Sequence, residues 1–332
     1  NKAIKLYKKC TERYPNHIYS KLNLSFLYYK LNNLEKAEIL IEEAIGLNPS
    51  LPNSYCIRGL ILRSLNKYNE AELSLKQAIK LDKNYFDAYI NLGLLNKDSN
   101  KFDEAEKNYL KALEINNESA IAHLNLGACY KDKQELEKAI LHTEKAIEID
   151  NKLEKCYLNL ATIFNQIGDY KKSLSLIKKE ILLNKNSDLS YHLLSELIRK
   201  GELLNVTKKD NRELLNNILN RKDISHRELF GNINSLISKE VLEKLLILES
   251  ELYENNEFNI LIKDKELVKA LSLLIFCSPL WEKVLRNLRK NILMSYSDKD
   301  KINNNILNFT IGLGSQCFLN EYVYYISTEE ED

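Results

Sequence analysis

Residues 86–119, FDAYINLGLLNKDSNKFDEAEKNYLKALEINNES, form one unit of a pattern that recurs every 34 residues along the first half of the chain. Alanine marks the pattern most clearly, in two columns seven residues apart. The columns are Ala3, Ala37, Ala71, Ala105 and Ala139, and Ala44, Ala78, Ala112 and Ala146. Small residues at one fixed interval let two helices approach closely in every unit. The interval therefore predicts structural repeats that stack on one another.

Three further columns fix the register of the repeats. A small residue recurs at Gly59, Gly93 and Gly127, and a bulky ring stands four residues earlier, at Tyr55, Tyr89, His123 and Tyr157. The second half of the unit contributes Tyr7, Ile41, Leu75, Tyr109, Thr143 and Ile177. This register gives a partial repeat 1–17, full repeats 18–51, 52–85, 86–119, 120–153 and 154–187, and a degenerate capping helix 188–200.

A unit of this length and pattern resembles the tetratricopeptide repeat, which is a helix–turn–helix. The resemblance covers residues 1 to about 200 and implies an all-α, right-handed superhelical solenoid. The last full repeat departs from the pattern, because Ser173 and Glu180 stand in its two alanine slots. After residue 200 the period disappears while helical spacing of apolar residues persists. We therefore expect a repeat domain at 1–200 and a helical bundle at 201–332 that covers the last repeat.

One polar column suggests a binding surface. Asn23, Asn91, Asn125 and Asn159 share one slot of the first helix, and Ile57 is the exception. The slot lies two residues before the glycine slot, so it is rotated by about 200° from the packed face. We expect the four amides on the concave face, partly exposed and unpaired by protein neighbours. Evenly spaced amides can pair with the backbone of an extended peptide, whereas solvated polar residues of an asparagine-rich chain are the simpler explanation.

This column resembles the asparagine ladder in the repeats of the O-linked N-acetylglucosamine transferases. The resemblance implies that the concave groove holds an extended protein or peptide. The slot before the asparagines is apolar, with residues Leu22, Cys56, Ile90, Leu124 and Leu158. A groove that clamps a chain-terminal carboxylate would carry Lys or Arg there. The sequence therefore disfavours that kind of repeat protein.

Composition limits the partners and the compartment. The formal net charge is +1, with Lys and Arg spread among Asp and Glu, so we expect no nucleic-acid partner. The most apolar stretch, 267–280, is too short to span a bilayer, so no membrane partner is expected. Six scattered cysteines form no metal-binding spacing, and the five histidines form none either. Reduced thiols suit a cytoplasmic protein, and neither a metal nor a cofactor is predicted.

The C-terminal region contains one clear helix start, at Ser278-Pro279, because serine caps helices and proline suits the first helical position. The helix that follows places Trp281, Val284, Leu285, Leu288 and Ile292 on one face and Lys283, Arg286, Arg289 and Lys290 on the other. That basic face is a solvated surface or a partner for the acidic tail 329–332. A last helix is expected at about 302–325, where Gly312 and Gly314 indicate helix packing and not a phosphate loop.

The segment 316–323, QCFLNEYV, resembles one in bacterial proteins that join such repeats to a methyltransferase dependent on S-adenosylmethionine. The match covers roughly 225–330. No catalytic residue is predicted in this chain. Cys317 could act as a nucleophile only with a basic partner, and no histidine occurs after His226. Two hypotheses remain: a non-catalytic protein-binding scaffold, or the substrate-recruiting arm of a larger methyltransferase or glycosyltransferase with its catalytic domain beyond residue 332. The chain opens within a repeat, so repeats are expected before residue 1.

Overall fold

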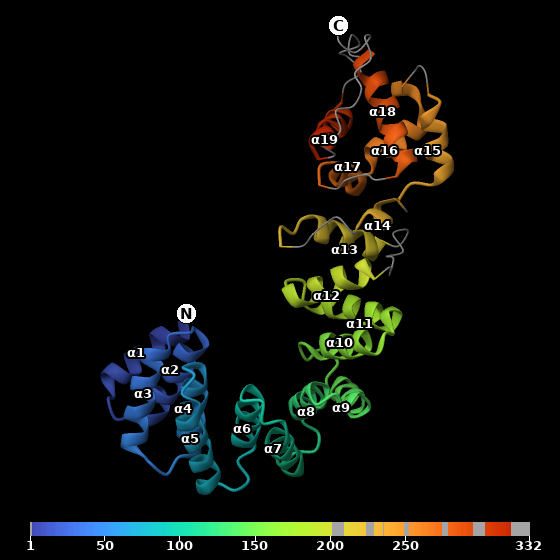
Figure 1. Cartoon of the computed structure of the whole chain (residues 1–332). Coiled ribbons are helices and arrows are strands. Elements are labelled where there is room, and N and C mark those ends of the chain that lie inside the picture. The colour runs from blue at the N-terminus through green and yellow to red at the C-terminus, as the bar shows by residue number, and fades with distance from the viewer. Residues whose placement is uncertain are drawn as a thin grey trace. The chain divides into compact units, whose positions relative to one another are not determined.

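The computed structural model describes residues 2–200, 209–223, 229–234, 236–248, 252–273, 278–294 and 303–319. These residues form helices joined by turns and contain no strand, which confirms the all-α prediction (Figure 1). The chain divides into two compact units, Asn1–Ile167 and Gly168–Asp332, each described here by itself. The domain boundary at residue 200, which marks the end of the sequence repeats, stays a prediction.

The N-terminal unit consists of antiparallel helix pairs that follow the predicted repeats. Each full repeat from 18–51 to 120–153 contributes two helices of 13 and 14 residues. The helices are α1 (Lys2–Arg13), α2 (Ile18–Lys30), α3 (Leu34–Leu47), α4 (Pro52–Ser64), α5 (Tyr68–Leu81), α6 (Phe86–Asp98), α7 (Phe102–Ile115), α8 (Ala120–Asp132), α9 (Leu136–Ile149) and α10 (Cys156–Ile167). Helix α1 is the second helix of the partial repeat.

A left-handed residue ends the turn inside each repeat. Backbone φ is positive at five positions that are 34 residues apart: Asn32 (58°), Asn66 (60°), Asn100 (57°), Gln134 (64°) and Gly168 (90°). Asparagine and glycine adopt this conformation more readily than other residues do. Part of the asparagine content of the chain therefore serves the turns and not the binding surface.

The alanine and glycine columns bring the two helices of each repeat together. Every alanine of both columns from Ala37 to Ala146 has no exposed surface. The glycine column faces the bulky column of the second helix: a Cβ built on Gly59 meets the side chain of Leu75, and one on Gly93 meets Tyr109. At Gly127 it meets both the side chain and the backbone of Thr143. The columns read from the sequence therefore form the packed seam.

The C-terminal unit begins with α11 and continues without the 34-residue period. Its helices are α11 (Tyr170–Leu183), α12 (Asp188–Arg199), α13 (Lys209–Leu219), α14 (Phe230–Asn234), α15 (Lys239–Leu246), the 3₁₀ turn η2 (Leu252–Glu254), α16 (Asn256–Lys263), α17 (Lys265–Leu271), α18 (Pro279–Met294) and α19 (Asn304–Leu319). Helix α13 contacts α12, because Asn217 donates to the Tyr191 hydroxyl at 3.2 Å. Arg221 also lies over the Tyr191 ring at 4.8 Å.

The predicted features of the last two helices are found where the structure describes them. Helix α18 begins at Pro279, its five predicted apolar residues are buried, and Lys283 and Arg286 are exposed. A Cβ on Gly312 would come within 2.9 Å of Leu271 on α17, which confirms helix packing there, whereas Gly314 has no close neighbour. The acidic tail, Cys277, the side chain of Cys317 and most of the segment 316–323 lie outside the described residues.

Candidate functional site

The first helices of successive repeats form one continuous face. Helix α2 contacts α4, α4 contacts α6, α6 contacts α8, and α8 contacts α10. Within residues 2–167, the second helices α3, α5, α7 and α9 make no comparable contacts with each other. First helices therefore lie closer together than second helices, which puts them on the inner side of the curved array.

The asparagine column lies on these first helices: Asn23 on α2, Asn91 on α6, Asn125 on α8 and Asn159 on α10. Asn23 is exposed and the other three are half-buried. The expectation that all four amides are unpaired is wrong for two of them. Asn23 Nδ2 donates to the Tyr7 hydroxyl at 3.3 Å, and Asn91 Nδ2 donates to Cys56 Sγ at 3.2 Å.

The amides of the other two asparagines remain available for hydrogen bonds. Neither the Asn125 nor the Asn159 side chain bonds another residue in the described part of the chain. A half-buried amide with free donors and acceptors is a site at which a bound polar group replaces water. The Asn125 and Asn159 amides therefore fit the predicted role more closely than those of Asn23 and Asn91 do.

A pocket of 350 Å³ opens on the same face, between α2, α4 and α6. Its lining consists of Asn23, Phe26, Asn53, Cys56, Ile57, Leu60, Asp87 and Asn91. Burial raises the pKa of the Cys56 thiol to about 12. The thiol is therefore protonated at neutral pH, and a protonated thiol is a poor nucleophile. The pocket suits binding and not covalent chemistry.

An apolar row runs beside the asparagine column and was missed in the sequence. It lies three residues later on α2, α4, α6 and α8, and consists of the half-buried side chains Phe26, Leu60, Leu94 and Ala128. Residues three apart lie on the same side of a helix, so each apolar side chain adjoins an asparagine slot. The signal was present as a column in the 34-residue register, but apolar residues in a repeat are ordinarily attributed to the core.

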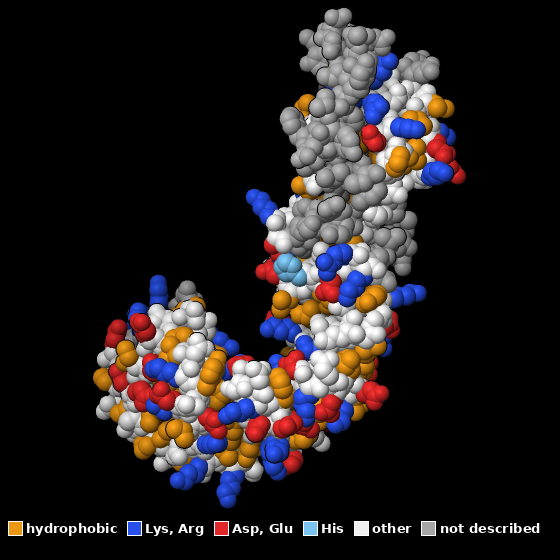
Figure 2. All heavy atoms as spheres, in the orientation of Figure 1, with side chains coloured by type: hydrophobic (Ala, Val, Ile, Leu, Met, Phe, Trp, Pro, Cys, Tyr) orange, Lys and Arg blue, Asp and Glu red, His pale blue; other side chains and the backbone are white. Residues whose placement is uncertain are grey.

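Ion pairs between neighbouring first helices neutralise charges along the array. Arg63 on α4 bonds Asp98 on α6 at 2.6 Å, and Lys97 on α6 bonds Asp132 on α8 at 3.0 Å. The surface seen in Figure 2 likewise mixes basic and acidic side chains over the repeats. These first helices therefore present paired charges and not a single-sign patch.

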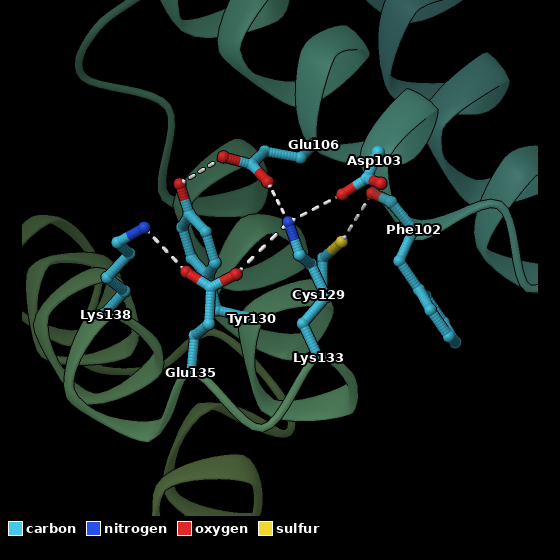
Figure 3. Close-up of polar contacts among 8 residues, drawn as sticks. All are labelled: Phe102, Asp103, Glu106, Cys129, Tyr130, Lys133, Glu135 and Lys138. Carbon is cyan, nitrogen blue, oxygen red and sulfur yellow. Dashed lines mark hydrogen bonds and ion pairs between the residues drawn. The ribbon is translucent and has the colours of Figure 1, made fainter.

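Lys133, just after α8, joins two repeats through three carboxylates (Figure 3). Its ammonium lies 2.9 Å from Asp103, 2.5 Å from Glu106 and 3.2 Å from Glu135. The Tyr130 hydroxyl donates to the other oxygen of Glu106 at 2.9 Å. Hydrogen bonds that the Lys133 ammonium donates to the Asp103 and Glu106 carboxylates raise the pKa of Lys133, so the amine is charged throughout the physiological range. The cluster is an electrostatic link between repeats.

Replacing Lys133 with methionine should lower the melting temperature, because three carboxylates would lose their shared cation and repel one another. We expect a decrease of about 3–6 °C in low salt and a smaller one in molar salt, since salt screens exposed charges. Thermal unfolding followed by circular dichroism measures the change. Lys76→Met is the matched control, because Lys76 forms an ion pair with Glu72 on the surface of the same helix, α5, and links no other repeat. Equal melting shifts for the two variants would contradict the linking role.

Two histidines that have no ligand spacing in the sequence meet between α8 and α9. His123 Nδ1 lies 2.9 Å from His142 Nδ1, and His123 is 3% exposed. His123 Nε2 bonds the Asn117 carbonyl at 3.3 Å, and a carbonyl can only accept. In the neutral pair, Nδ1 of His123 therefore accepts and His142 donates. Burial lowers the pKa of both histidines, to about 4 for His142.

The described residues show no metal centre and no membrane span. No group of three or more His, Cys, Asp or Glu side chains in them is placed to hold a metal ion. None of the described helices is long and apolar enough to cross a membrane.

Comparison with known proteins identifies the repeats. The tetratricopeptide repeat family matches residues 18–51 and 120–153, and a second family of the same repeat matches 59–99 and 96–134. The first two segments coincide with repeats predicted from the alanine register. These segments are therefore tetratricopeptide repeats. No curated protein sequence matches the chain significantly.

Solved structures with the same fold include two with low sequence identity. A structure of pilF from Pseudomonas aeruginosa is 15% identical, with a TM-score of 0.51, over 60% of this chain and 88% of its own. The Cut9–Hcn1 hetero-tetramer of the APC/C is 14% identical, with a TM-score of 0.56, over 67% of this chain and 44% of its own. At such identities the likeness concerns the fold alone.

Proposed function

We propose that the tetratricopeptide repeats bind an extended segment of a partner protein along the face formed by α2, α4, α6, α8 and α10. The asparagine column carries this proposal, because four amides occupy the same slot on one face and only Ile57 interrupts them. In the proposed complex, Asn91, Asn125 and Asn159 pair with successive backbone groups of the peptide. The similarity to the asparagine ladder of the O-linked N-acetylglucosamine transferases supports the same role.

Backbone pairing of this kind depends little on the peptide sequence. Each hydrogen bond contributes about 0.5–1.5 kcal/mol net, and ordering a flexible peptide opposes binding. Four bonds then give an affinity of about micromolar at best. We propose a weak, exchangeable interaction with protein in the cytoplasm and no role in nucleic-acid binding.

The test replaces Asn91, Asn125 and Asn159 together with alanine. A peptide selected by the wild-type chain from a random twelve-residue library serves as the probe, and fluorescence polarisation measures its dissociation constant. We expect binding to weaken about tenfold or more, because several polar contacts are lost. The helical signal in circular dichroism should stay unchanged, since these side chains are not in the packed seam.

A matched control removes amides from the second helices instead. Gln77 on α5 and Asn108 on α7 lie outside the proposed face, so their double alanine variant should bind the peptide as the wild type does. If both variants bind the selected peptide equally well, the asparagine column is not the peptide site.

An alternative function extends this one. The resemblance of 316–323 to a segment of repeat-linked methyltransferases supports a role for this chain as the substrate-recruiting arm of a larger enzyme. Its groove would then hold the protein that is modified. Both functions need the same asparagine face, so the alanine variants test that face in either case.

A further inference from the structure

The interruption of the asparagine column at Ile57 coincides with the pocket between α2, α4 and α6. We infer that Ile57 forms a side-chain subsite, which selects an aliphatic or aromatic residue of the bound segment with a basic residue two positions away. This inference rests on the proposed peptide function and adds sequence preference to it. The flanking amides would hold the backbone, and the position without an amide would read a side chain.

The apolar part of the pocket is well defined. Ile57 and Cys56 are buried, with 7% and 3% of their surface exposed, and Phe26 and Leu60 are half-buried. All four belong to the lining. A cavity of 350 Å³ lies at the lower end of the range for ligand pockets, about 300–1,000 Å³, which suits one side chain and not a cofactor. Hydrophobic burial would stabilise a leucine there and would disfavour an asparagine.

The polar groups stand on both sides of this apolar centre. Asn23 on α2 and Asn91 on α6 belong to the same lining as Ile57 on the intervening helix α4. Side chains of an extended peptide alternate in direction, so a backbone held at two points can direct one side chain inward between them. An asparagine at position 57 would replace this apolar surface with a third amide.

Charge at the rim points to a basic neighbour. Asp87 is exposed and is the one acidic or basic side chain of the lining, whereas the Cys56 thiol is protonated. Asp87 forms no ion pair with any cation in the described part of the chain. An unbalanced carboxylate at the mouth attracts Lys or Arg and repels Asp or Glu. The preferred occupant is therefore an extended peptide with a large apolar residue and a basic residue two positions away, on the same side of the peptide.

Three fluorescein-labelled twelve-residue peptides test this preference. They share an alanine, serine and threonine background and differ at two central positions separated by one alanine. These positions carry Leu and Lys (Leu-Lys), Asn and Lys (Asn-Lys), or Leu and Glu (Leu-Glu). We expect the wild type to bind Leu-Lys about tenfold more tightly than Asn-Lys, since one buried apolar side chain gives this order of discrimination. We expect about threefold tighter binding of Leu-Lys than of Leu-Glu, because an exposed charge contributes modestly.

Two substitutions should remove these preferences separately. Ile57→Asn copies the residue of four other repeats and should abolish the difference between the Leu-Lys and Asn-Lys peptides. Asp87→Ala should abolish the difference between Leu-Lys and Leu-Glu, whereas Glu35→Ala, an exposed carboxylate on α3, should preserve it. Because Ile57 also packs in the core around α2 and α3, Leu60→Ser tests the same apolar wall if Ile57→Asn unfolds.

The outcomes separate the subsite from the peptide function. Asn91→Ala should weaken all three peptides alike and keep their ratios. If both Ile57→Asn and Leu60→Ser still bind the Leu-Lys peptide more tightly than the Asn-Lys peptide, the subsite is overturned. Equal binding of all three peptides by the wild type would overturn it as well. A wild-type chain that binds none of them would contradict the peptide function, and the subsite with it.

Discussion

Replacing Gly127 with alanine should lower the free energy of unfolding by about 2 kcal/mol, as expected for overpacking in a closely packed interior. A Cβ at this position would overlap Thr143 Oγ1 and would lie 3.1 Å from the Thr143 amide nitrogen and 3.2 Å from the Ala139 carbonyl oxygen. Rotation of the Thr143 side chain can relieve only the first of these contacts, because the other two atoms belong to the backbone of α9. The helices α8 and α9 must separate. Urea unfolding followed by circular dichroism measures the loss.

Two variants show whether the helix contact is the cause. Gly46→Ala on α3 adds a methyl group where no atom lies within 4 Å, and it should stabilise the chain by about 0.5–1 kcal/mol through helix propensity. Combining Gly127→Ala with Thr143→Ala removes the nearest atom, so part of the lost stability should return. If Gly127→Ala leaves the urea midpoint unchanged, the two helices are not in close contact at this glycine.

Repeat architecture was predictable because several residue columns obey the same geometric requirement. Each alanine or glycine in the seam must be small where two helices approach, so a fixed interval in the sequence reports a fixed interval in space. The same logic located the first helices and the face that bears the asparagine column. The beginning of α18 at Pro279 followed from local chemistry, since proline is compatible with the first helical turn.

Other parts of the site could not be predicted, because they depend on contacts between repeats. The pairing of Asn91 with Cys56 joins α6 to α4 across 35 residues, and no spacing rule within one helix indicates it. The pocket at Ile57 likewise needs three first helices side by side. The contact of His123 with His142 is formed by the antiparallel packing of α8 on α9, which places residues 19 apart next to each other.

The turn asparagines show a second limit of the sequence. Asn32, Asn66 and Asn100 recur at the same interval as the column on the first helices, yet they serve the left-handed turn inside each repeat. Composition alone cannot separate these two uses of one residue type. The position within the repeat separates them. The turn asparagines follow the end of the first helix, whereas the asparagine column stands in the middle of that helix on the proposed binding face.

Acidification from pH 7 to pH 5 should destabilise the chain through the pair His123 and His142. The pKa of His142 is lowered from 6.5 to about 4 in the folded chain, first by burial and then by the charge of His123. Below pH 6.5 the unfolded chain therefore binds protons that the folded chain does not. Stability contributed by the neutral pair is present above pH 6.5 and is lost as the pH falls toward 4. Partial solvent screening reduces the effect to about 1–2 kcal/mol at pH 5.

Most of the charges around the pair also lower the pKa of His142. Lys145 and Lys138 disfavour protonation of His142, and Glu106 favours it. The preceding repeat carries Tyr89 and Asn108 in the two equivalent slots. There the Tyr89 hydroxyl bonds the Lys83 carbonyl, as His123 bonds that of Asn117. A double variant with His123→Tyr and His142→Asn therefore copies the two residues of the preceding repeat. Neither of the introduced side chains titrates between pH 5 and pH 7.

Urea unfolding of both proteins at pH 7, 6 and 5 provides the measurement. The wild type should lose stability at each step, and the double variant should lose about 1–2 kcal/mol less over the whole range. His17, His192 and His226 remain in both proteins, so the difference between the two pH profiles belongs to the replaced pair. Parallel profiles would mean that the folded pair takes up protons as readily as the unfolded chain, which its burial between α8 and α9 should prevent.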